Sequence, residues 1–178
     1  WGLVPSWVKT PNATSRHINA RSETVASKPS FRDAFQSRRC LIPASGFIEW
    51  KRAGKQRIPW LFRQSDEGPF CFAGLWESHT AADGDNIETC ALLTTAPNAV
   101  MQPIHDRMPV VLAADQYETW LQTTATPPAS LLAPSPAEWW RAERISSRIN
   151  SVRHDDPACL APAGIDDLIE TIDELPLG

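Results

Sequence analysis

The stretch RCLIPASGFIEWK at residues 39–51 decides the fold, because it contains two short runs, 39–43 and 46–51, with the composition of β-strands. Ala44 and Ser45 separate the two runs, the first of which ends at Pro43 and the second of which begins at Gly46. Further strand-like runs follow at 59–63, 70–77 and 87–95, with the turn sequences RAGK, SDEG and DGDN between them. We therefore expect an α+β fold of mainly antiparallel strands in a barrel-like core, with a few short peripheral helices.

Helices are expected to be few, because nine prolines interrupt the first 110 residues. The predicted helices are 31–37 and 115–122, and the second should have Asp115 at its N-cap and Glu118 in a capping box. A last strand pair is expected within 140–149 and a short acidic helix at 166–174. We find no internal repeat and no linker, so a single domain over 1–178 is expected.

The composition argues against several classes of protein. The chain has 178 residues, 42% of them hydrophobic, which is enough for one domain with its own core. It has no run of 18 apolar residues, so no membrane partner is expected. The four cysteines lie far apart, without a CxxC motif or clustered histidines. We expect reduced thiols, no metal, no cofactor and a cytoplasmic monomer.

The charge distribution is more informative than the net charge of −4. Up to residue 64 there are twelve Lys and Arg against three Asp and Glu, and the remainder has five against eighteen. This asymmetry predicts a basic surface in the N-terminal third that could bind nucleic acid. Alternatively, the two sets of charges intermix in space and cancel.

Two short motifs contain candidates for proton transfer. Glu49 lies between Ile48 and Trp50 in a predicted strand, where burial beside aromatic rings would raise the pKa of its carboxyl group. The alternative is an exposed glutamate paired with Lys51. His105, in the proline-bounded sequence PIHDRMP, is also placed for proton transfer, although a lone histidine is more often structural.

A third motif, INARSET at 18–24, offers an amide and a guanidinium. Asn19 and Arg21 are two residues apart, so an extended backbone would put them on one face. Such a pair could hold sugar or phosphate oxygens, or it could be part of a buried structural network.

Taken together, the motifs resemble those of the SRAP family, named for SOS response-associated peptidase. The resemblance rests on WGLVPSW at 1–7, NARSET at 19–24, RCLIPASGFIEW at 39–50, HDRMP at 105–109, and ISSRIN at 145–150 with the following DDP. It runs in one order from residue 1 to about 162. Any one motif is weak, but the ordered set is specific.

The resemblance implies a sensor of abasic sites in single-stranded DNA, with a nucleoid-associated location. In the family, the cysteine after the removed initiator methionine forms a thiazolidine with the abasic sugar, which leaves a DNA–protein crosslink. By motif match, Glu49 is the acid/base residue, His105 assists ring opening and crosslink reversal, and Asn19 positions the sugar. The resemblance further implies DNA contacts by the residues Trp7, Arg21, Lys28, Thr94 and Arg107.

The nucleophilic cysteine itself is not matched within residues 1–178, so we expect a native N-terminal segment upstream of Trp1. Two other functions stay open. One is a crosslink-dead module that only binds single-stranded DNA. The other is a cysteine peptidase using Cys40 and His105, which is disfavoured because Cys40 lies in an apolar strand-like run, where thiols are usually inert.

Overall fold

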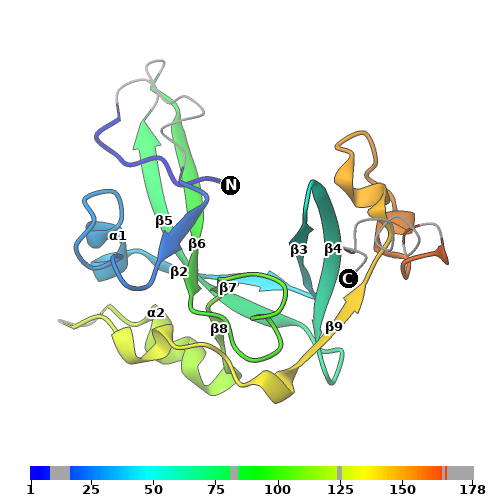
Figure 1. The fold of residues 1–178 in the computed structure, drawn as a ribbon. Helices are drawn as coiled ribbons and strands as arrows, with labels where there is room; N and C mark the ends of the chain where they lie inside the picture. Colours follow the sequence, from blue (N-terminus) through cyan, green and yellow to red (C-terminus); the bar gives the residue numbers. More distant parts are fainter. Residues whose placement is uncertain (9–16, 81–83, 124–125, 166, 168–178) are drawn as a thin grey trace. The chain divides into compact units, whose positions relative to one another are not determined.

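The structure, a computed structural model, describes residues 1–8, 17–80, 84–123, 126–165 and 167 (Figure 1). The chain divides into two compact units, each assembled from segments that are distant in sequence. The six-stranded unit comprises Trp1–Ala44, Phe70–Ala96 and Arg107–Ser135, and the three-stranded unit comprises Ser45–Pro69, Pro97–Asp106 and Pro136–Gly178. The expectation of one domain over 1–178 stays a prediction.

The six-stranded unit is organised around the hairpin of β5 (Phe70–Thr80) and β6 (Asn86–Thr95). On one side, β2 (Arg39–Ala44) pairs antiparallel with β5. On the other side, β1 (Asn19–Arg21) pairs parallel with β6 and forms the edge of the main path through the sheet. Two short strands complete it: β7 (Met108–Pro109) pairs with β6, and β8 (Val111–Leu112) with β5. The NARSET motif therefore lies beside the C-terminal end of β6.

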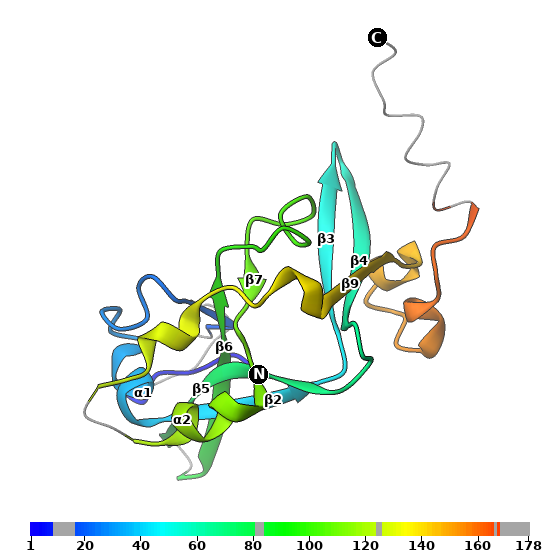
Figure 2. The same cartoon turned by 90° about the horizontal axis from the view of Figure 1, so that it is seen from below.

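Two short helices contribute to the core of this unit. Figure 2 shows α1 (Arg32–Ser37) and α2 (Tyr117–Leu121) beside β2. The ring centroids of Phe35 and Trp120, both buried, lie 6.2 Å apart. Strands β5 and β6 add fully buried aliphatic residues, among them Leu75 and Leu93. Burial of these apolar side chains is the main stabilising term of the unit.

The buried Arg39 connects both helices to the sheet. Its guanidinium donates to the carbonyls of Phe35 at 2.7 Å and Gln36 at 2.8 Å, near the end of α1. It also donates to the carbonyls of Trp120 at 2.6 Å and of Gln122, at the end of α2. A cation at a helix C-terminus satisfies carbonyls that have no partner within the helix. This basic residue is therefore used in the core and not on the surface.

The three-stranded unit contains β3 (Phe47–Ala53), β4 (Gln56–Gln64) and β9 (Trp140–Arg144), all antiparallel. Gly54 has a φ of 56° in the turn between β3 and β4, a conformation that favours glycine. Phe47 stacks on Phe62 at 5.0 Å and meets Trp140 edge-to-face at 5.3 Å. These cross-strand aromatic contacts hold β3 in place on β4.

Most of the fold expectations are confirmed. The fold is α+β, dominated by antiparallel strands, and the five strands predicted between residues 39 and 95 correspond to β2–β6. The predicted helix 31–37 corresponds to α1. In the described part of the chain, short 3₁₀ helices lie at Ala114–Gln116, Ala129–Leu132, Ala137–Trp139, Ser147–Asn150 and Pro157–Leu160.

Two expectations are wrong. The N-cap before α2 is not Asp115: the first turn is 3₁₀, and the Gln116 side chain accepts a hydrogen bond from the Ala113 backbone N–H at 3.0 Å. The strand pair within 140–149 is a single strand, β9, because residues 147–150 form a 3₁₀ helix capped by Ser146. The acidic helix expected at 166–174 lies outside the described residues except for Asp167. No helix in the described part of the chain is long and apolar enough to cross a membrane.

Candidate functional site

In the three-stranded unit, Glu49 and His105 face each other. Glu49 lies in the middle of β3, where it pairs with Trp60 of β4. His105 lies in a turn whose backbone is tied down, since its N–H donates to the Met101 carbonyl at 3.0 Å. The Asn98 side chain accepts from the Met101 N–H at 3.0 Å and so orders the start of the same turn. Strand and turn together bring Glu49 Oε2 to 3.9 Å from His105 Nε2.

Burial raises the pKa of the Glu49 carboxyl group above its ordinary value. The nearby His105 opposes this increase, as does a hydrogen bond from the Trp50 backbone, whereas Asp106 adds to it. Both side chains are still reachable, with exposed fractions of 26% for Glu49 and 38% for His105. This environment agrees with the prediction that burial raises the pKa of Glu49.

The 3.9 Å separation is too long for a direct hydrogen bond. It is short enough for one oxygen of a third molecule to lie about 2.8 Å from both groups. The other imidazole nitrogen, Nδ1, lies 3.4 Å from the Asp106 carboxylate. The arrangement can therefore deliver a proton to, or accept one from, a single substrate hydroxyl.

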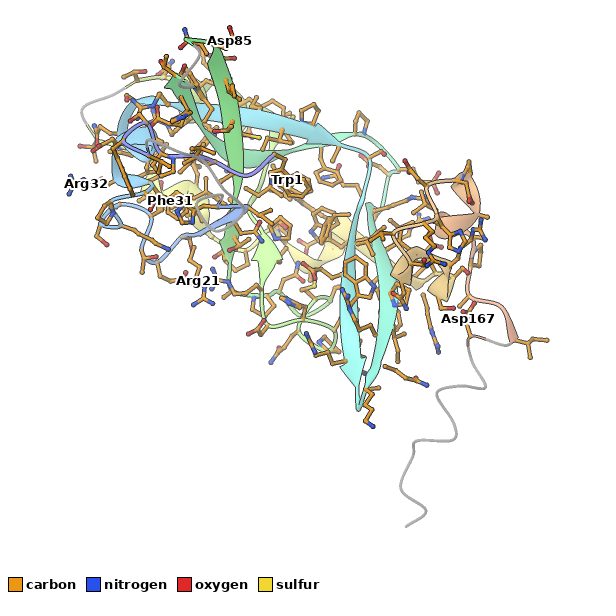
Figure 3. All side chains as sticks on the ribbon, turned by 90° about the horizontal axis from the view of Figure 1, so that it is seen from above. Trp1, Arg21, Phe31, Arg32, Asp85 and Asp167 are labelled. Atoms are coloured by element: carbon orange, nitrogen blue, oxygen red, sulfur yellow. The ribbon has the colours of Figure 1, made fainter. Side chains whose placement is uncertain are left out.

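In the six-stranded unit, Asn19 and Arg21 lie on the exposed face of β1. The strand alternates exposed, buried and exposed, because Ala20 between them is fully buried. Asn19 is in register with Leu92 and Arg21 with Thr94. Figure 3 shows the Arg21 side chain directed away from the sheet. The prediction that Asn19 and Arg21 share one face is confirmed.

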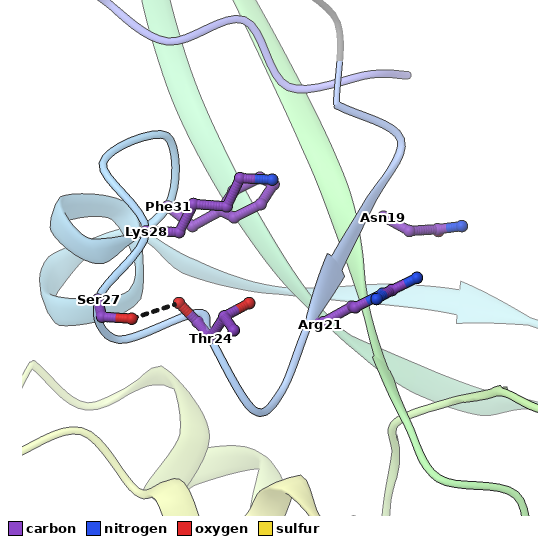
Figure 4. A pocket seen from close by; sticks show the side chains of 6 residues that line it. All are labelled: Asn19, Arg21, Thr24, Ser27, Lys28 and Phe31. Carbon is purple, nitrogen blue, oxygen red and sulfur yellow. Dashed lines mark hydrogen bonds between the residues drawn. The ribbon is translucent and has the colours of Figure 1, made fainter.

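These two residues line a pocket of about 580 Å³, with walls from β1 and from the turn that leads to α1 (Figure 4). Lys28 lies across it, with its ammonium 5.2 Å from the centroid of the Phe31 ring. The Ser27 hydroxyl donates to the Thr24 carbonyl at 3.2 Å. The lining residues are Asn19, Arg21, Thr24, Ser27, Lys28 and Phe31. Two cations, an amide and two hydroxyls without a carboxylate suit the oxygens of an anionic ligand.

Next to this pocket, Arg107 is bound by Glu23. Its Nη1 lies 2.6 Å from Glu23 Oε1, and its Nη2 lies 2.9 Å from Oε2. Nη2 also donates to the Thr94 carbonyl at 2.6 Å. Hydrogen bonding from Arg107 is the largest cause that lowers the pKa of Glu23 to about 2. No role for Glu23 was expected from its sequence motif, because its partner is 84 residues away and leaves no local signal.

Two further predicted DNA contacts, Thr94 and Trp7, lie in the six-stranded unit outside the lining of this pocket. Thr94 is on β6 opposite Arg21, and it is not among the residues that line the pocket. Trp7 is 64% exposed, in a turn of the six-stranded unit. The DNA contacts of these two residues stay predictions. Thr24, Ser27 and Phe31 were missed, because neither a hydroxyl in a turn nor a single aromatic residue has a distinctive spacing in one sequence.

The cysteines do not form a second site. All four are free, and burial, followed by the neighbouring Cys90, raises the pKa of the Cys40 thiol to about 11. A thiol with such a pKa is protonated at neutral pH and is a poor nucleophile, which argues against the peptidase alternative. In the described part of the chain, no three His, Cys, Asp or Glu side chains are grouped so as to hold a metal ion.

Comparison with known proteins identifies similar chains. The family model described as SOS response associated peptidase (SRAP) matches residues 1–152. The abasic site processing protein YoqW of Bacillus subtilis is 42% identical over 161 residues, covering 88% of this chain and 72% of that protein. The abasic site processing protein HMCES of Gallus gallus is 30% identical over 187 residues, covering 91% and 56%.

Solved structures show the same fold. An X-ray structure of a protein from Bacteroides thetaiotaomicron matches with a TM-score of 0.85 and 32% identity, covering 92% of this chain and 75% of that one. A second, from Bordetella bronchiseptica, matches with a TM-score of 0.73 and 29% identity, covering 82% and 75%.

Proposed function

The chain belongs to the SOS response-associated peptidase (SRAP) family, and from this premise we propose that it processes abasic sites in single-stranded DNA. The observation that carries the proposal is the Glu49–His105 pair, a carboxyl group with a raised pKa 3.9 Å from an imidazole. The names of the similar proteins, abasic site processing proteins, support the choice of substrate.

The chemistry that this pair suits is condensation of an amine with an aldehyde. An abasic deoxyribose in its ring-opened form presents an aldehyde, and the amine adds to it to give a carbinolamine. Loss of water then needs one proton delivered to the leaving hydroxyl and one removed from nitrogen. Glu49 and His105 can exchange both protons, since one substrate oxygen fits within reach of each.

The family resemblance assigns the amine and the thiol to an N-terminal cysteine outside residues 1–178. Its α-amine, with a pKa near 8, is a better nucleophile at neutral pH than a lysine. Its thiol would close a thiazolidine on the imine carbon and leave a stable crosslink. We assign to Glu49 the additional role of assisting removal of the initiator methionine, which exposes this amine.

The pocket beside β1 is the proposed site for the DNA backbone. The Asn19 amide would hold a sugar oxygen, and Arg21 and Lys28 would each neutralise a phosphate. Each neutralised phosphate of a single strand contributes about −0.7 to the slope of log affinity against log salt. The exposed indole of Trp7 offers a stacking surface that tolerates any base.

The test is covalent capture by the full-length protein with its native N-terminus. The protein is incubated with a single-stranded oligonucleotide that has one abasic site, and the products are resolved on a denaturing gel. We expect a shifted adduct with this oligonucleotide and none with a tetrahydrofuran analogue, which has no aldehyde. Equal salt-sensitive binding of both oligonucleotides without any adduct would instead establish the non-covalent binding module.

A further inference from the structure

We propose that the Glu23–Arg107 ion pair is a positioning device that holds β1, and with it Asn19 and Arg21, at a fixed place on β6. The claim that β1 is fixed on β6 rests on the geometry of the six-stranded unit. The claim that this affects the rate of adduct formation rests on the proposed function. Neither Glu23 nor Arg107 lines the pocket beside β1.

The strand β1 needs such a device. It has three residues and pairs in parallel with β6 alone, at the edge of the main sheet path. Parallel pairing is slightly weaker per residue than antiparallel pairing, and a three-residue edge strand has few ladder hydrogen bonds. Yet two of its three side chains, Asn19 and Arg21, form one wall of the pocket. Their positions are only as well defined as the pairing of β1 with β6.

The ion pair fixes the end of β1 at one atom of β6. The Thr94 carbonyl accepts a hydrogen bond from the Ser22 backbone N–H at 2.8 Å, directly after β1. The same carbonyl accepts from Arg107 Nη2 at 2.6 Å, while the guanidinium holds Glu23, the next residue along the chain, through both carboxylate oxygens. Arg107 therefore bridges the segment after β1 to the strand on which β1 is placed.

The residue types suit this role. A guanidinium binds a carboxylate through two parallel hydrogen bonds, so it fixes orientation as well as distance. With its pKa at about 2, Glu23 stays ionised throughout the neutral and mildly acidic range. Arg107 also neutralises a carboxylate that would otherwise repel phosphates close to the pocket. The phosphate contact that the family resemblance implies for Arg107 is a separate role, and the two roles make opposite predictions.

The experiment compares Glu23→Gln, Arg107→Gln and the double variant in the full-length protein. The matched control is Glu67→Gln, which removes the same charge from an exposed ion pair with Arg141. Adduct formation is measured at saturating abasic DNA, well below the melting temperature, and binding is measured with undamaged single strands. We expect the saturated rate to fall about tenfold in each single variant, and no further in the double variant. The control should keep the wild-type rate.

If Arg107 serves only as a phosphate contact, Glu23→Gln frees it and strengthens binding without slowing the saturated rate, and that result overturns the proposal. The structural part has its own measurement, hydrogen exchange of the peptide covering Asn19–Thr24. We expect its exchange to accelerate at least tenfold in both single variants and not in the control. Should the wild-type protein give no adduct, the proposed function fails, while unchanged exchange in the variants is what would refute the positioning role.

Discussion

Glu23, which follows β1, and Glu49, which lies in β3, are each paired with a basic side chain. Their environments shift the pKa of the two carboxyl groups in opposite directions. Glu23 is half exposed and is held by two short hydrogen bonds to Arg107, which lower its pKa to about 2. Glu49 is mostly buried, 3.9 Å from His105, and burial raises its pKa.

The difference shows how one residue type can serve two purposes in a small protein. A carboxylate locked to a guanidinium cannot exchange its proton near neutral pH, so it can only hold something in place. A carboxyl group that is partly desolvated and loosely paired can change its protonation state at little cost. In the sequence, the neighbours Ile48 and Trp50 already indicate a raised pKa for Glu49, whereas nothing near Glu23 points to its partner Arg107.

The largest expected effect is a slower rate of adduct formation when Glu49 can no longer transfer a proton. Glu49→Gln removes the proton-exchanging group and keeps its shape, so adduct formation should slow at least about 100-fold, since general acid–base catalysis contributes about 10²–10⁴-fold. Single-turnover rates with abasic single strands measure this. Binding of undamaged DNA should not change. A rate within threefold of the wild type would mean that Glu49 does not transfer protons.

The effect of the Glu23–Arg107 ion pair on the rate of adduct formation should depend on its hydrogen-bond geometry and not only on its charges. Arg107→Lys keeps the positive charge but cannot make two parallel hydrogen bonds to Glu23 and a third to the Thr94 carbonyl. We expect the saturated rate of adduct formation to fall about as far as in Arg107→Gln, roughly tenfold, which is the scale of one lost charge-assisted hydrogen bond. Full activity of the lysine variant would show that charge alone suffices.

The features that could be predicted from the sequence are those with local signals. The strands β2–β6 were predictable because their composition and turns are local signals, and Gly54 lies at the turn where its conformation is needed. Asn19 and Arg21 were placed on one face by the period of a strand alone. The first turn before α2 was mispredicted, since Asp115 and Gln116 compete for capping and only the three-dimensional backbone decides.

The role of Glu23 could not be predicted, because its partner is 84 residues away and the pairing depends on the β1–β6 register. The basic N-terminal third was likewise only partly informative. Arg39 is buried against helix carbonyls, and Arg38 is paired with Glu77 at 2.7 Å. A count of charges cannot separate such internal uses from a DNA-binding surface.

The two glutamates should contribute to stability with opposite pH dependence. Because the pKa of Glu23 is lowered on folding, its contribution is present above pH 4.5 and is lost as the pH falls toward 2. After allowing for solvent screening at this half-exposed pair, Glu23→Gln should cost about 1 kcal/mol at pH 7 and less than half of that at pH 3.

For Glu49 the sign is reversed. A pKa raised on folding means that the ionised form is disfavoured in the folded state, so the cost appears as the pH rises above the ordinary value. Glu49→Gln should therefore raise the free energy of unfolding at pH 7.5 and leave it unchanged at pH 3. Urea unfolding of both variants across this pH range measures the two trends. Parallel curves for both would contradict the different environments seen in the structure.

The smallest expected effect concerns a residue that belongs to neither pair. Lys28 contributes a point charge to the pocket, with its ammonium over the Phe31 ring and no carboxylate among the lining residues. Lys28→Gln should weaken binding of single-stranded DNA a few-fold and reduce the magnitude of the salt slope by about 0.7, because one phosphate is no longer neutralised. The saturated rate of adduct formation should stay the same, since Lys28 neither exchanges the proton nor holds β1. Lys55→Gln, in the turn between β3 and β4, is the control for loss of one exposed charge. A change in the saturated rate with Lys28→Gln would mean that Lys28 also orients the reacting sugar and does not merely attract the DNA backbone.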